Sequence, residues 1–335
     1  MLSLSILDQV LISSGQSSTK TLSNSIELAK LADTLGYKRY WIAEHHSSKY
    51  FANSTPEILM SSIASQTKNI VVGSGGILLN HYSPYKIAEN LRLLEALYPN
   101  RIDAGFGRAS GGEVYATQAL QGENNSVSYD LKINQVVNYL TKKVEIDNDL
   151  IVSPIITSYP EVWLLGSSMK TAKIAANQGL SFAFGHFLTP GDEGSAIEYY
   201  LSNFKPSLVL KEPKVALCIN VICADSEDKC QELAKSQDAM SILINRGLNP
   251  DGIPSPKELA NLELTEEEKE LIKNSRNLIL GTPQKVKEEI LSLCSYYKAD
   301  EIIILTNTYN HRDKLHSYKL IMDVMQDEIE IKKCL

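Results

Sequence analysis

Three ionisable side chains, Glu44, His45 and His46, follow directly on the apolar run at residues 40–43. Such a run is typical of a buried strand, and ligands bind at the carboxyl ends of the strands in barrels and open α/β sheets. Carboxylate and imidazole groups placed there can move protons near neutral pH. A pair of adjacent histidines can also lie on a surface loop or make structural hydrogen bonds. The choice between these interpretations depends on the residues at the other strand ends.

Glycines stand at two further places where strands are expected to end. Gly75 and Gly76 follow a run at residues 69–73, and two glycines let the backbone come close to a flat ligand. They could also mark a simple bulge. Gly107 and Arg108 come after the next apolar run. An arginine can hold phosphate through two parallel hydrogen bonds, although a surface ion pair is the ordinary use of a lone arginine.

A third cluster stands where the apolar run at residues 162–165 turns directly into a helix. The first-turn amide groups and hydroxyls of such a helix point outward and, with the helix dipole, favour a bound anion. An ordinary serine N-cap would account for its serines equally well. Together with Arg108, the cluster predicts a phosphate pocket. Its members are Gly166, Ser167, Ser168 and Thr171.

Strands and helices alternate along the chain in a way that would bring these clusters together. Apolar residues at helical spacing separate the strands, with Gly36 as a stop for the first helix and Pro56 and Pro84 at two helix starts. Eight strands with interleaved helices over more than about 250 residues predict a (β/α)8 TIM barrel. A doubly wound sheet is the alternative, but no GxGxxG follows the first strand. The expected strands begin at residues 2, 40, 69, 101, 162, 180, 214 and 301, within a single domain spanning residues 1–335.

Two segments depart from this alternation. Residues 109–128 are polar and rich in glycine, which predicts an active-site loop. Residues 246–280 carry several prolines and an acidic run, and they form an insertion before the last strand–helix unit. Long insertions in compact domains are usually lids or mobile loops, although surface loops also tolerate excursions without a role. We expect the insertion to be a mobile lid.

Composition and charge narrow the class of protein. The chain has 335 residues, 43% apolar and 22% charged, with a net charge of -7 and no Lys/Arg cluster, so no nucleic-acid partner is expected. Its five cysteines lack paired CxxC spacing, which predicts reduced thiols in a cytoplasmic protein and no metal site. The first residues lack a basic segment, and no apolar run approaches the roughly 18 residues of a membrane span. No membrane partner is therefore expected.

Taken in order, the motifs resemble those of the bacterial luciferase-like flavin-dependent monooxygenases. The resemblance is carried by Tyr-Trp-Ile-Ala-Glu-His-His at residues 40–46, Val-Gly-Ser-Gly-Gly-Ile-Leu-Leu at 72–79 and Val-Trp-Leu-Leu-Gly-Ser-Ser at 162–168. Gly-Thr-Pro at residues 281–283 and Ala-Asp-Glu at 299–301 agree with it, so it covers nearly the whole chain. It implies a (β/α)8 barrel that binds reduced FMN at its C-terminal mouth and uses O₂.

The resemblance also implies roles for individual residues. His45 corresponds to the family's catalytic histidine beside the flavin ring, where it handles protons around the peroxyflavin. Gly75 and Gly76 correspond to a non-prolyl cis peptide packed under the isoalloxazine. The insertion takes the place of a mobile lid that keeps water off the intermediate. Cofactor-binding positions are implied at Glu44, His46, Gly75, Gly76, Gly107, Arg108, Gly166, Ser167, Ser168, Thr171 and His186.

One departure bears on light emission. Gly107 stands where the luciferase subunit has a cysteine by the flavin, so a non-luminous member is expected. The leading hypothesis is a monooxygenase that oxygenates a small aldehyde- or alkane-like substrate through a C4a-peroxyflavin. A separate NAD(P)H:flavin reductase would supply the reduced FMN, and His45 would act as general base or proton donor.

Other functions and an assembly state are also consistent with the resemblance. The same barrel hosts F420-dependent oxidoreductases that transfer a hydride without O₂, and the family includes non-catalytic flavin-binding partner subunits. A barrel enzyme of unrelated chemistry, such as a metal-dependent hydrolase that uses Glu44, His45, His46 and His186, is a third alternative outside the resemblance. A homodimer formed through helices at residues 56–66 and 84–97, as in the family, is expected, although core packing alone would explain the small and apolar residues of these helices nearly as well.

Overall fold

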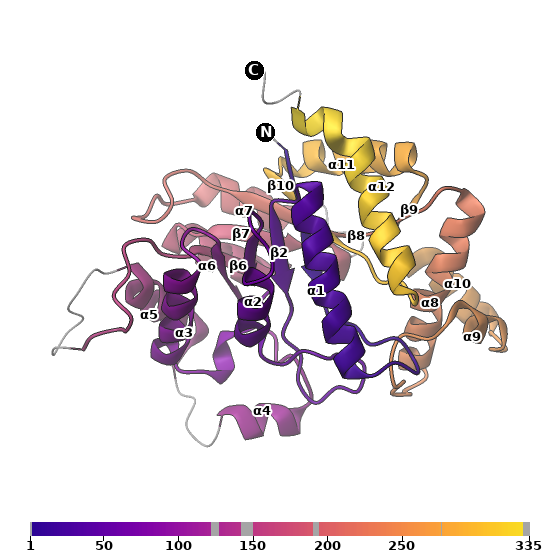
Figure 1. Cartoon of the computed structure of the whole chain (residues 1–335), viewed down its shortest axis with the longest axis horizontal. Helices are drawn as coiled ribbons and strands as arrows, with labels where there is room; N and C mark the ends of the chain where they lie inside the picture. Colours follow the sequence, from indigo (N-terminus) through magenta and orange to yellow (C-terminus); the bar gives the residue numbers. More distant parts are fainter. Residues whose placement is uncertain (1, 122–126, 142–149, 190–193, 276, 331–335) are drawn as a thin grey trace.

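Eight parallel strands form a closed barrel in the computed structural model, which describes residues 2–121, 127–141, 150–189, 194–275 and 277–330 (Figure 1). The ring closes because the last strand pairs with both the first strand and the seventh. This arrangement confirms the (β/α)8 barrel. The strands are β1 (Ser3–Asp8), β2 (Arg39–Ile42), β3 (Val71–Ser74), β5 (Ile102–Gly107), β6 (Glu161–Gly166), β7 (Ser181–Gly185), β8 (Val215–Cys223) and β10 (Glu301–Leu305).

Helices cover the outside of the barrel (Figure 1). The first begins where the Ser17 hydroxyl accepts a hydrogen bond from the Lys20 N–H at 3.2 Å, and it ends where Gly36 adopts a φ of 86°. Prolines occupy the first position of the next two helices, where the N–H they lack would be unpaired anyway. The helices are α1 (Ser18–Leu35), α2 (Pro56–Ala64), α3 (Pro84–Leu97), α5 (Tyr129–Thr141), α6 (Met169–Gln178), α7 (Ser195–Asn203), α8 (Glu227–Asn245), α11 (Pro283–Tyr297) and α12 (His311–Glu330).

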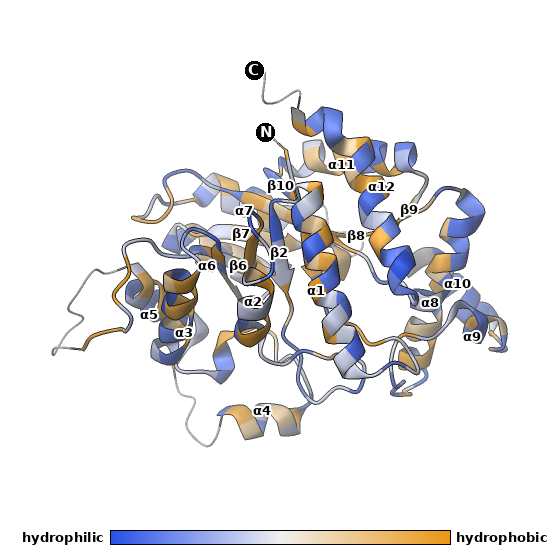
Figure 2. Ribbon diagram, in the orientation of Figure 1, coloured by the Kyte–Doolittle hydropathy of each residue, from blue (hydrophilic) through white to orange (hydrophobic). Residues whose placement is uncertain are grey.

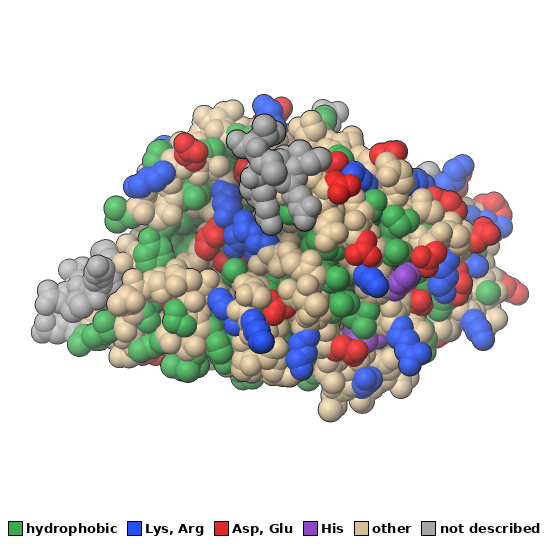
Figure 3. Space-filling view, turned by 45° about the horizontal axis from the view of Figure 1, so that its top comes forward, with side chains coloured by type: hydrophobic (Ala, Val, Ile, Leu, Met, Phe, Trp, Pro, Cys, Tyr) green, Lys and Arg blue, Asp and Glu red, His purple; other side chains and the backbone are tan. Residues whose placement is uncertain are grey.

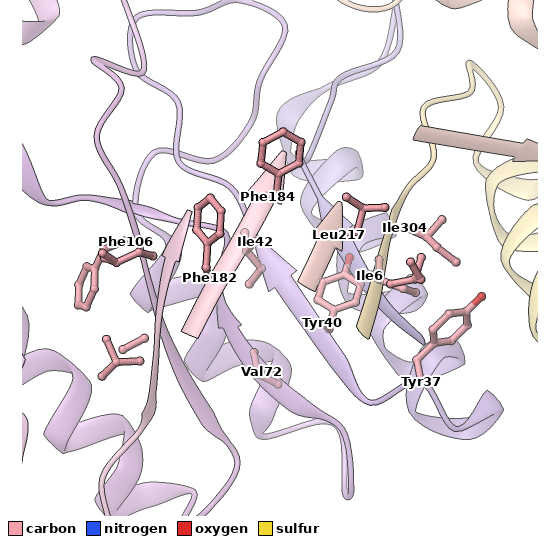
Figure 4. Packing of buried hydrophobic residues seen from close by; sticks show 14 of the residues in the cluster. Ile6, Tyr37, Tyr40, Ile42, Val72, Phe106, Phe182, Phe184, Leu217 and Ile304 are labelled. Atoms are coloured by element: carbon pink, nitrogen blue, oxygen red, sulfur yellow. The ribbon is translucent and has the colours of Figure 1, made fainter. Parts of the chain in front are cut away.

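Alternate residues of each strand face opposite sides of the barrel wall. Outward residues pack against the helices in a large apolar layer, to which Ile6, Phe182 and Ile304 belong (Figure 4). The helices supply the other side of this layer, and Figure 2 shows apolar and polar residues side by side along them. Inward residues form a smaller cluster in which Trp41 and Trp163 meet edge to face, 5.3 Å between ring centroids.

Charged side chains fill the barrel at the amino ends of its strands. Arg39 on β2 donates hydrogen bonds to Asp103 at 2.6 Å, Glu161 at 2.8 Å and Glu301 at 3.0 Å, each on a different strand. Trp41, two residues further along β2, donates its indole N–H to Asp103 at 2.8 Å. This network and the tryptophans above it set the depth to which a ligand can enter from the carboxyl ends.

Short elements interrupt the alternation that the sequence predicts. α4 (Val114–Gln121) lies within the segment expected to be a loop, so that expectation is wrong there. β4 (Ile77–Leu78) pairs with β5, β9 (Ile279–Gly281) pairs with β8, and two 3-10 turns, η1 (Leu79–His81) and η2 (His186–Leu188), follow strands. Elements of two or three residues are too short for hydrophobic periodicity to reveal. Residues 122–126 of the predicted loop, residue 276 of the insertion and Cys334 lie outside the described residues.

The insertion at residues 246–280 contains regular structure. It includes α9 (Pro256–Ala260) and α10 (Glu266–Ser275) before the chain returns to the barrel through β9. Arg246, at the start of the insertion, donates to the Glu268 carboxylate at 2.7 Å and 2.8 Å. These two bonds hold α10 against the end of α8.

Backbone pairing also ties the insertion to the mouth of the barrel. The Ile253 N–H donates to the carbonyl of Ile12 at 2.7 Å, and the Ser14 N–H donates to the carbonyl of Ile253 at 2.9 Å. Ile12 and Ser14 belong to the loop after β1, at the carboxyl ends of the strands. The insertion therefore contacts the edge of the mouth, and its motion as a lid stays a prediction.

The outer surface carries charges of both signs. On the face drawn in Figure 3, Lys and Arg side chains are interspersed with Asp and Glu side chains. None of the helices in the described parts of the chain is both long and apolar enough to cross a membrane.

Candidate active site at the mouth of the barrel

The carboxyl ends of the strands surround a cavity of about 890 Å³. Its floor is the upper part of the cluster inside the barrel, including Leu7, Trp41 and Cys218. Burial raises the pKa of the Cys218 thiol well above its ordinary value, so this side chain is an uncharged part of the floor. Cavities of this size commonly hold cofactors and small ligands. The predicted site residues that line it are Glu44, His45, Gly75, Gly76, Gly107, Arg108, Gly166, Ser167, Ser168 and Thr171.

The carboxylate of Glu44 is fully buried and has its hydrogen bonds satisfied by neighbouring groups. His46 Nε2 lies 2.6 Å from Oε1, the Tyr82 hydroxyl donates to Oε1 at 2.7 Å, and the Leu78 N–H donates to Oε2 at 3.1 Å. A carboxylate held by three partners fixes the surrounding loops. His46 is used in this network and is not among the residues that line the cavity.

His45, by contrast, lines the cavity, and the loop that follows it holds its position. The backbone N–H of His45 donates to the carbonyl of Asn53 at 3.1 Å, and the Asn53 side chain donates to the carbonyl of Ala43 at 2.8 Å. The imidazole stacks on Phe51 at 3.6 Å between ring centroids, with 13° between the planes. Burial, with a smaller contribution from His46, lowers the pKa of His45 from 6.5 to about 4. The imidazole is therefore neutral at pH 7.

The two predicted glycines form a wall of bare backbone beside His45. The peptide bond between Gly75 and Gly76 is cis, as the resemblance implies. A Cβ on Gly75 would lie 2.5 Å from Leu7 Cδ1, and one on Gly76 would lie 2.8 Å from the carbonyl oxygen of Gly105. Side chains at either position would therefore clash with neighbouring strands, and the backbone itself borders the cavity.

The β6–α6 turn supplies the groups expected of an anion site. Ser168 is the N-cap of α6, and its Oγ accepts from the Thr171 N–H at 3.4 Å and lies 3.2 Å from Thr171 Oγ1. A Cβ on Gly166 would lie 2.8 Å from Thr171 Oγ1, so only glycine lets this turn close so tightly. Arg108 lines the same cavity. Burial raises the pKa of the Tyr129 hydroxyl, and the positive charge of Arg108 acts in the opposite direction. Two cations, Arg108 and Lys170, thus border one cavity together with hydroxyls and a helix N-terminus.

His186 is a predicted residue that the structure places outside this cavity. It lines a separate cavity of about 330 Å³, together with Asn220, Asn277 and Glu289. The next two residues, Phe187 and Leu188, line the main cavity. Successive side chains of a 3-10 turn project about 120° apart, so one turn faces both cavities. The expectation that His186 joins the other cofactor-binding positions is therefore not supported.

A sequence profile of luciferase-like monooxygenases matches residues 3–296. This chain belongs to that family. It is 41% identical over 334 residues to the uncharacterised protein YwcH of Bacillus subtilis (strain 168), covering 98% of this chain and 100% of that one. It is also 32% identical over 332 residues to the N-acetyl-S-alkylcysteine monooxygenase of the same strain, covering 97% and 98% of the two chains.

Solved structures of similar proteins share the barrel. Apo-MsnO8 has a TM-score of 0.91 at 33% identity, covering 97% of this chain and 99% of that one. The oxygenating constituent of 3,6-diketocamphane monooxygenase from Pseudomonas putida, in complex with FMN, has a TM-score of 0.69 at 20% identity, covering 96% and 97%. An F420-dependent secondary alcohol dehydrogenase has 0.64 at 14%, covering 96% and 98%. The last two likenesses show the fold alone and do not choose between FMN and F420.

The residues of this family member fit a phosphorylated flat cofactor. Arg108 and the start of α6 could hold a phosphate, and the backbone at Gly75 and Gly76 offers a surface without side chains. Within the described part of the chain, no group of three or more His, Cys, Asp or Glu side chains is placed to hold a metal ion. The metal-dependent hydrolase therefore has no support from those residues.

Several residues of the family member's site escape sequence reasoning. Phe51 and Asn53 hold His45, Tyr82 binds Glu44, and Gln9 lines the cavity after β1. Each lies in a loop without a recognisable motif. Their position shortly after an expected strand is the one sequence signal that could have pointed to them.

Proposed function

We propose that this protein is a monooxygenase that uses reduced FMN and O₂ to oxygenate a small organic substrate. The observation that carries the proposal is that one cavity joins a phosphate corner, a bare glycine wall and a neutral histidine. The phosphate corner consists of Arg108 and the β6–α6 turn. Family membership supports the class of reaction, and the N-acetyl-S-alkylcysteine monooxygenase shows by its name that a relative oxygenates small molecules.

Each part of the cavity has a role in this proposal. Arg108, Ser167, Ser168 and Thr171 bind the phosphate and so fix the cofactor's orientation. Bound reduced FMN supplies the electrons that activate O₂. His45, neutral at pH 7, takes up or donates a proton at the reacting atoms, with Phe51 and Asn53 keeping its ring in place. Glu44 and His46 hold the loop from which His45 projects.

Water has to be kept from this chemistry, and the reduced cofactor has to come from elsewhere. The apolar floor and the insertion at residues 246–280, as a lid, exclude water from the cavity. The sequence lacks a dinucleotide-binding fingerprint, so a separate NAD(P)H:flavin reductase delivers reduced FMN. The cysteines in the described part of the chain form no disulfide with one another, which fits a cytoplasmic location.

The protein acts as a homodimer in this proposal. α2 and α3 lie side by side on the outside of the barrel (Figure 1). Ile58, Leu93 and Leu97 on these neighbouring helices are 72%, 53% and 56% exposed. A second copy that covers this α2/α3 face would bury them.

Isotope incorporation tests the reaction itself. The protein is supplied with NADH, a flavin reductase, FMN and ¹⁸O₂, and decanal, decane and N-acetyl-S-butylcysteine are offered as substrates. One ¹⁸O atom should appear in a product of the wild-type protein, and His45→Ala should lower that yield by roughly 100-fold or more. If all reducing equivalents end as hydrogen peroxide with every substrate, the monooxygenase is wrong. Substrate turnover with reduced or oxidised F420 in the absence of O₂ would assign hydride transfer instead.

A further inference from the structure

Four residues with amide side chains are linked by hydrogen bonds along one side of the barrel, from β8 past β10 to β1, and the last of them lines the cavity. Asn220 on β8 donates from Nδ2 to Gln237 Oε1 at 2.8 Å. Gln237 on α8 donates from Nε2 to the backbone carbonyl of Asn307, beyond β10, at 2.9 Å. Asn307 donates from Nδ2 to Gln9 Oε1 at 2.9 Å. Gln9, the residue after β1, lines the cavity.

Hydrogen-bond chemistry fixes the orientation of the Gln237 amide. A backbone carbonyl only accepts, so the Gln237 atom that contacts Asn307 has to be the amide nitrogen. The oxygen of Gln237 is then left to accept from Asn220. The Asn307 side chain makes a separate bond, in which its Nδ2 donates to Gln9. Gln9 thus has its oxygen engaged. Its Nε2 donates to no other protein group within the described residues, and so its N–H groups are available to a ligand.

Gln9 lies across the mouth from the phosphate corner. In the ring of eight strands, β1 is four strands away from β6 in either direction. The floor on the side of β1 is apolar, with Leu7 from β1, Ile303 from β10 and Cys218 from β8. A cofactor anchored by its phosphate at the β6–α6 turn, with its flat ring along the glycine wall, leaves the rest of the β1 side of the cavity to another molecule.

We propose that Gln9 donates a hydrogen bond from Nε2 to a carbonyl or carboxylate oxygen of the organic substrate. The apolar part of that substrate rests on Leu7, Cys218 and Ile303. This inference rests on the proposed function, because it assigns the β1 side of the cavity to the molecule that is oxygenated. The substrate class is therefore an apolar molecule with an acceptor oxygen. Asn307 and Gln237 are positioning residues that hold the Gln9 amide in the donating orientation.

Two probes that differ in acceptor oxygens test the proposal. N-acetyl-S-butylcysteine has carboxylate and amide oxygens, whereas butyl methyl sulfide has the thioether and the butyl chain without them. Their dissociation constants are measured by titration calorimetry on the full chain, with and without FMN. We expect the wild-type protein to prefer the first probe by roughly tenfold or more, as one hydrogen bond to an acceptor allows.

Variants of Gln9 assign that preference to one side chain. Gln9→Leu should abolish it, and Gln9→Glu should do the same because it keeps an acceptor for Asn307 but removes the N–H groups. Gln326→Glu on the exposed side of α12 is the charge-matched control and should bind like wild type. Affinity for FMN should stay within about twofold in all three variants, with thermal melting as the check of folding.

Three results would overturn the proposal. The first is a wild-type protein without preference between the probes, and the second is a preference that survives in both Gln9 variants. The third is a selective loss of FMN affinity in Gln9→Leu, which would place Gln9 on the cofactor. A failure of the proposed function can be told apart from a failure of this inference, because a protein that does not bind FMN can still show the preference between the probes. Gln237→Leu should lower the preference without changing FMN affinity, whereas a merely structural role would lower both.

Discussion

His45 is a titratable group whose surroundings decide its charge. Burial, and to a lesser extent His46, lowers its pKa to about 4, and the Phe51 ring covers one face of the imidazole. A neutral imidazole has one donor and one acceptor nitrogen, so it can pass a proton in either direction without first losing one to solvent. The position of Phe51 therefore matters to function as well as to packing.

Removing Phe51 should return His45 toward its ordinary pKa. Phe51→Ala admits water to the ring, so we expect the pKa of His45 to rise from about 4 toward 6.5. Phe51→Leu keeps an apolar cover and should leave the pKa low. The measurement is an NMR titration of the imidazole, assigned by comparison with His45→Gln. A pKa that is the same in wild type and Phe51→Ala would show that the ring does not shield His45.

The lowered pKa of His45 makes the free energy of unfolding depend on pH. Because the folded pKa of about 4 lies below the unfolded value of about 6.5, the unfolded chain binds more protons between these two pH values. The contribution of His45 is therefore fully present above about pH 6.5 and is lost as the pH falls through 4. In urea unfolding at pH 7 and pH 5, His45→Gln should lose less stability on acidification than wild type does. An equal loss would contradict this.

The reactive side chains could be predicted from the sequence better than the residues that hydrogen-bond to them. His45 and Arg108 could be placed together because both follow strands, and the ends of barrel strands meet. Asn53 and Tyr82 could not be found, because the contacts of Asn53 depend on how the β2–α2 loop folds back on itself, and the bond from Tyr82 to Glu44 joins two loops. His186 follows a strand as well, but the geometry of a 3-10 turn directs it to another cavity.

At the scale of elements, β5 approaches β3 so closely that one glycine is indispensable and another is not. A Cβ on Gly105 would lie 2.0 Å from the backbone oxygen of Ser74, whereas a Cβ on Gly107 would lie 3.2 Å from Leu78 Cδ2, the end of a flexible side chain. We expect Gly105→Ala to lower the free energy of unfolding by about 3 kcal/mol, and Gly107→Ala by less than about 1 kcal/mol. Urea unfolding of both variants is the measurement, and equal losses would contradict the packing described.

The elements that sequence reasoning found and missed differ in length. The eight barrel strands are marked by apolar runs, since strands buried on both faces have nearly continuous apolar sequences. β4 and β9 are too short to produce a pattern, and α4 lies in a polar, glycine-rich segment where no helix is expected. The insertion could be recognised by its prolines, but not the Arg246 bonds to Glu268 that fold it back on α8.

For the whole molecule, the alternation of strands and helices predicts the barrel. It does not predict the charged side chains that fill the barrel at the amino ends of its strands. Arg39 forms ion pairs with three carboxylates, on three strands that are far apart in the sequence. Such a network depends on which strands oppose each other in the closed ring. It leaves the carboxyl ends of the strands as the location of the 890 Å³ cavity.

The proposed homodimer predicts the effect of a charge on the α2/α3 face. Leu93→Asp and Ile58→Asp would place a carboxylate in the interface, so each should shift the protein from dimer to monomer in light scattering at micromolar concentration. Leu208→Asp is the control, because Leu208 is 87% exposed and lies outside α2 and α3. A wild-type monomer, or a dimer unchanged by both substitutions, would rule out this interface.

The proposed phosphate corner and flavin cavity are tested by an anaerobic titration that compares a phosphorylated flavin with one that lacks the phosphate. Wild type and Arg108→Ala are titrated with reduced FMN, reduced riboflavin and reduced F420. We predict that wild type prefers reduced FMN over both of the others, and that Arg108→Ala loses roughly tenfold to 100-fold in FMN affinity with little change for riboflavin. Equal binding of FMN and riboflavin by wild type, or a preference for F420, would contradict the account.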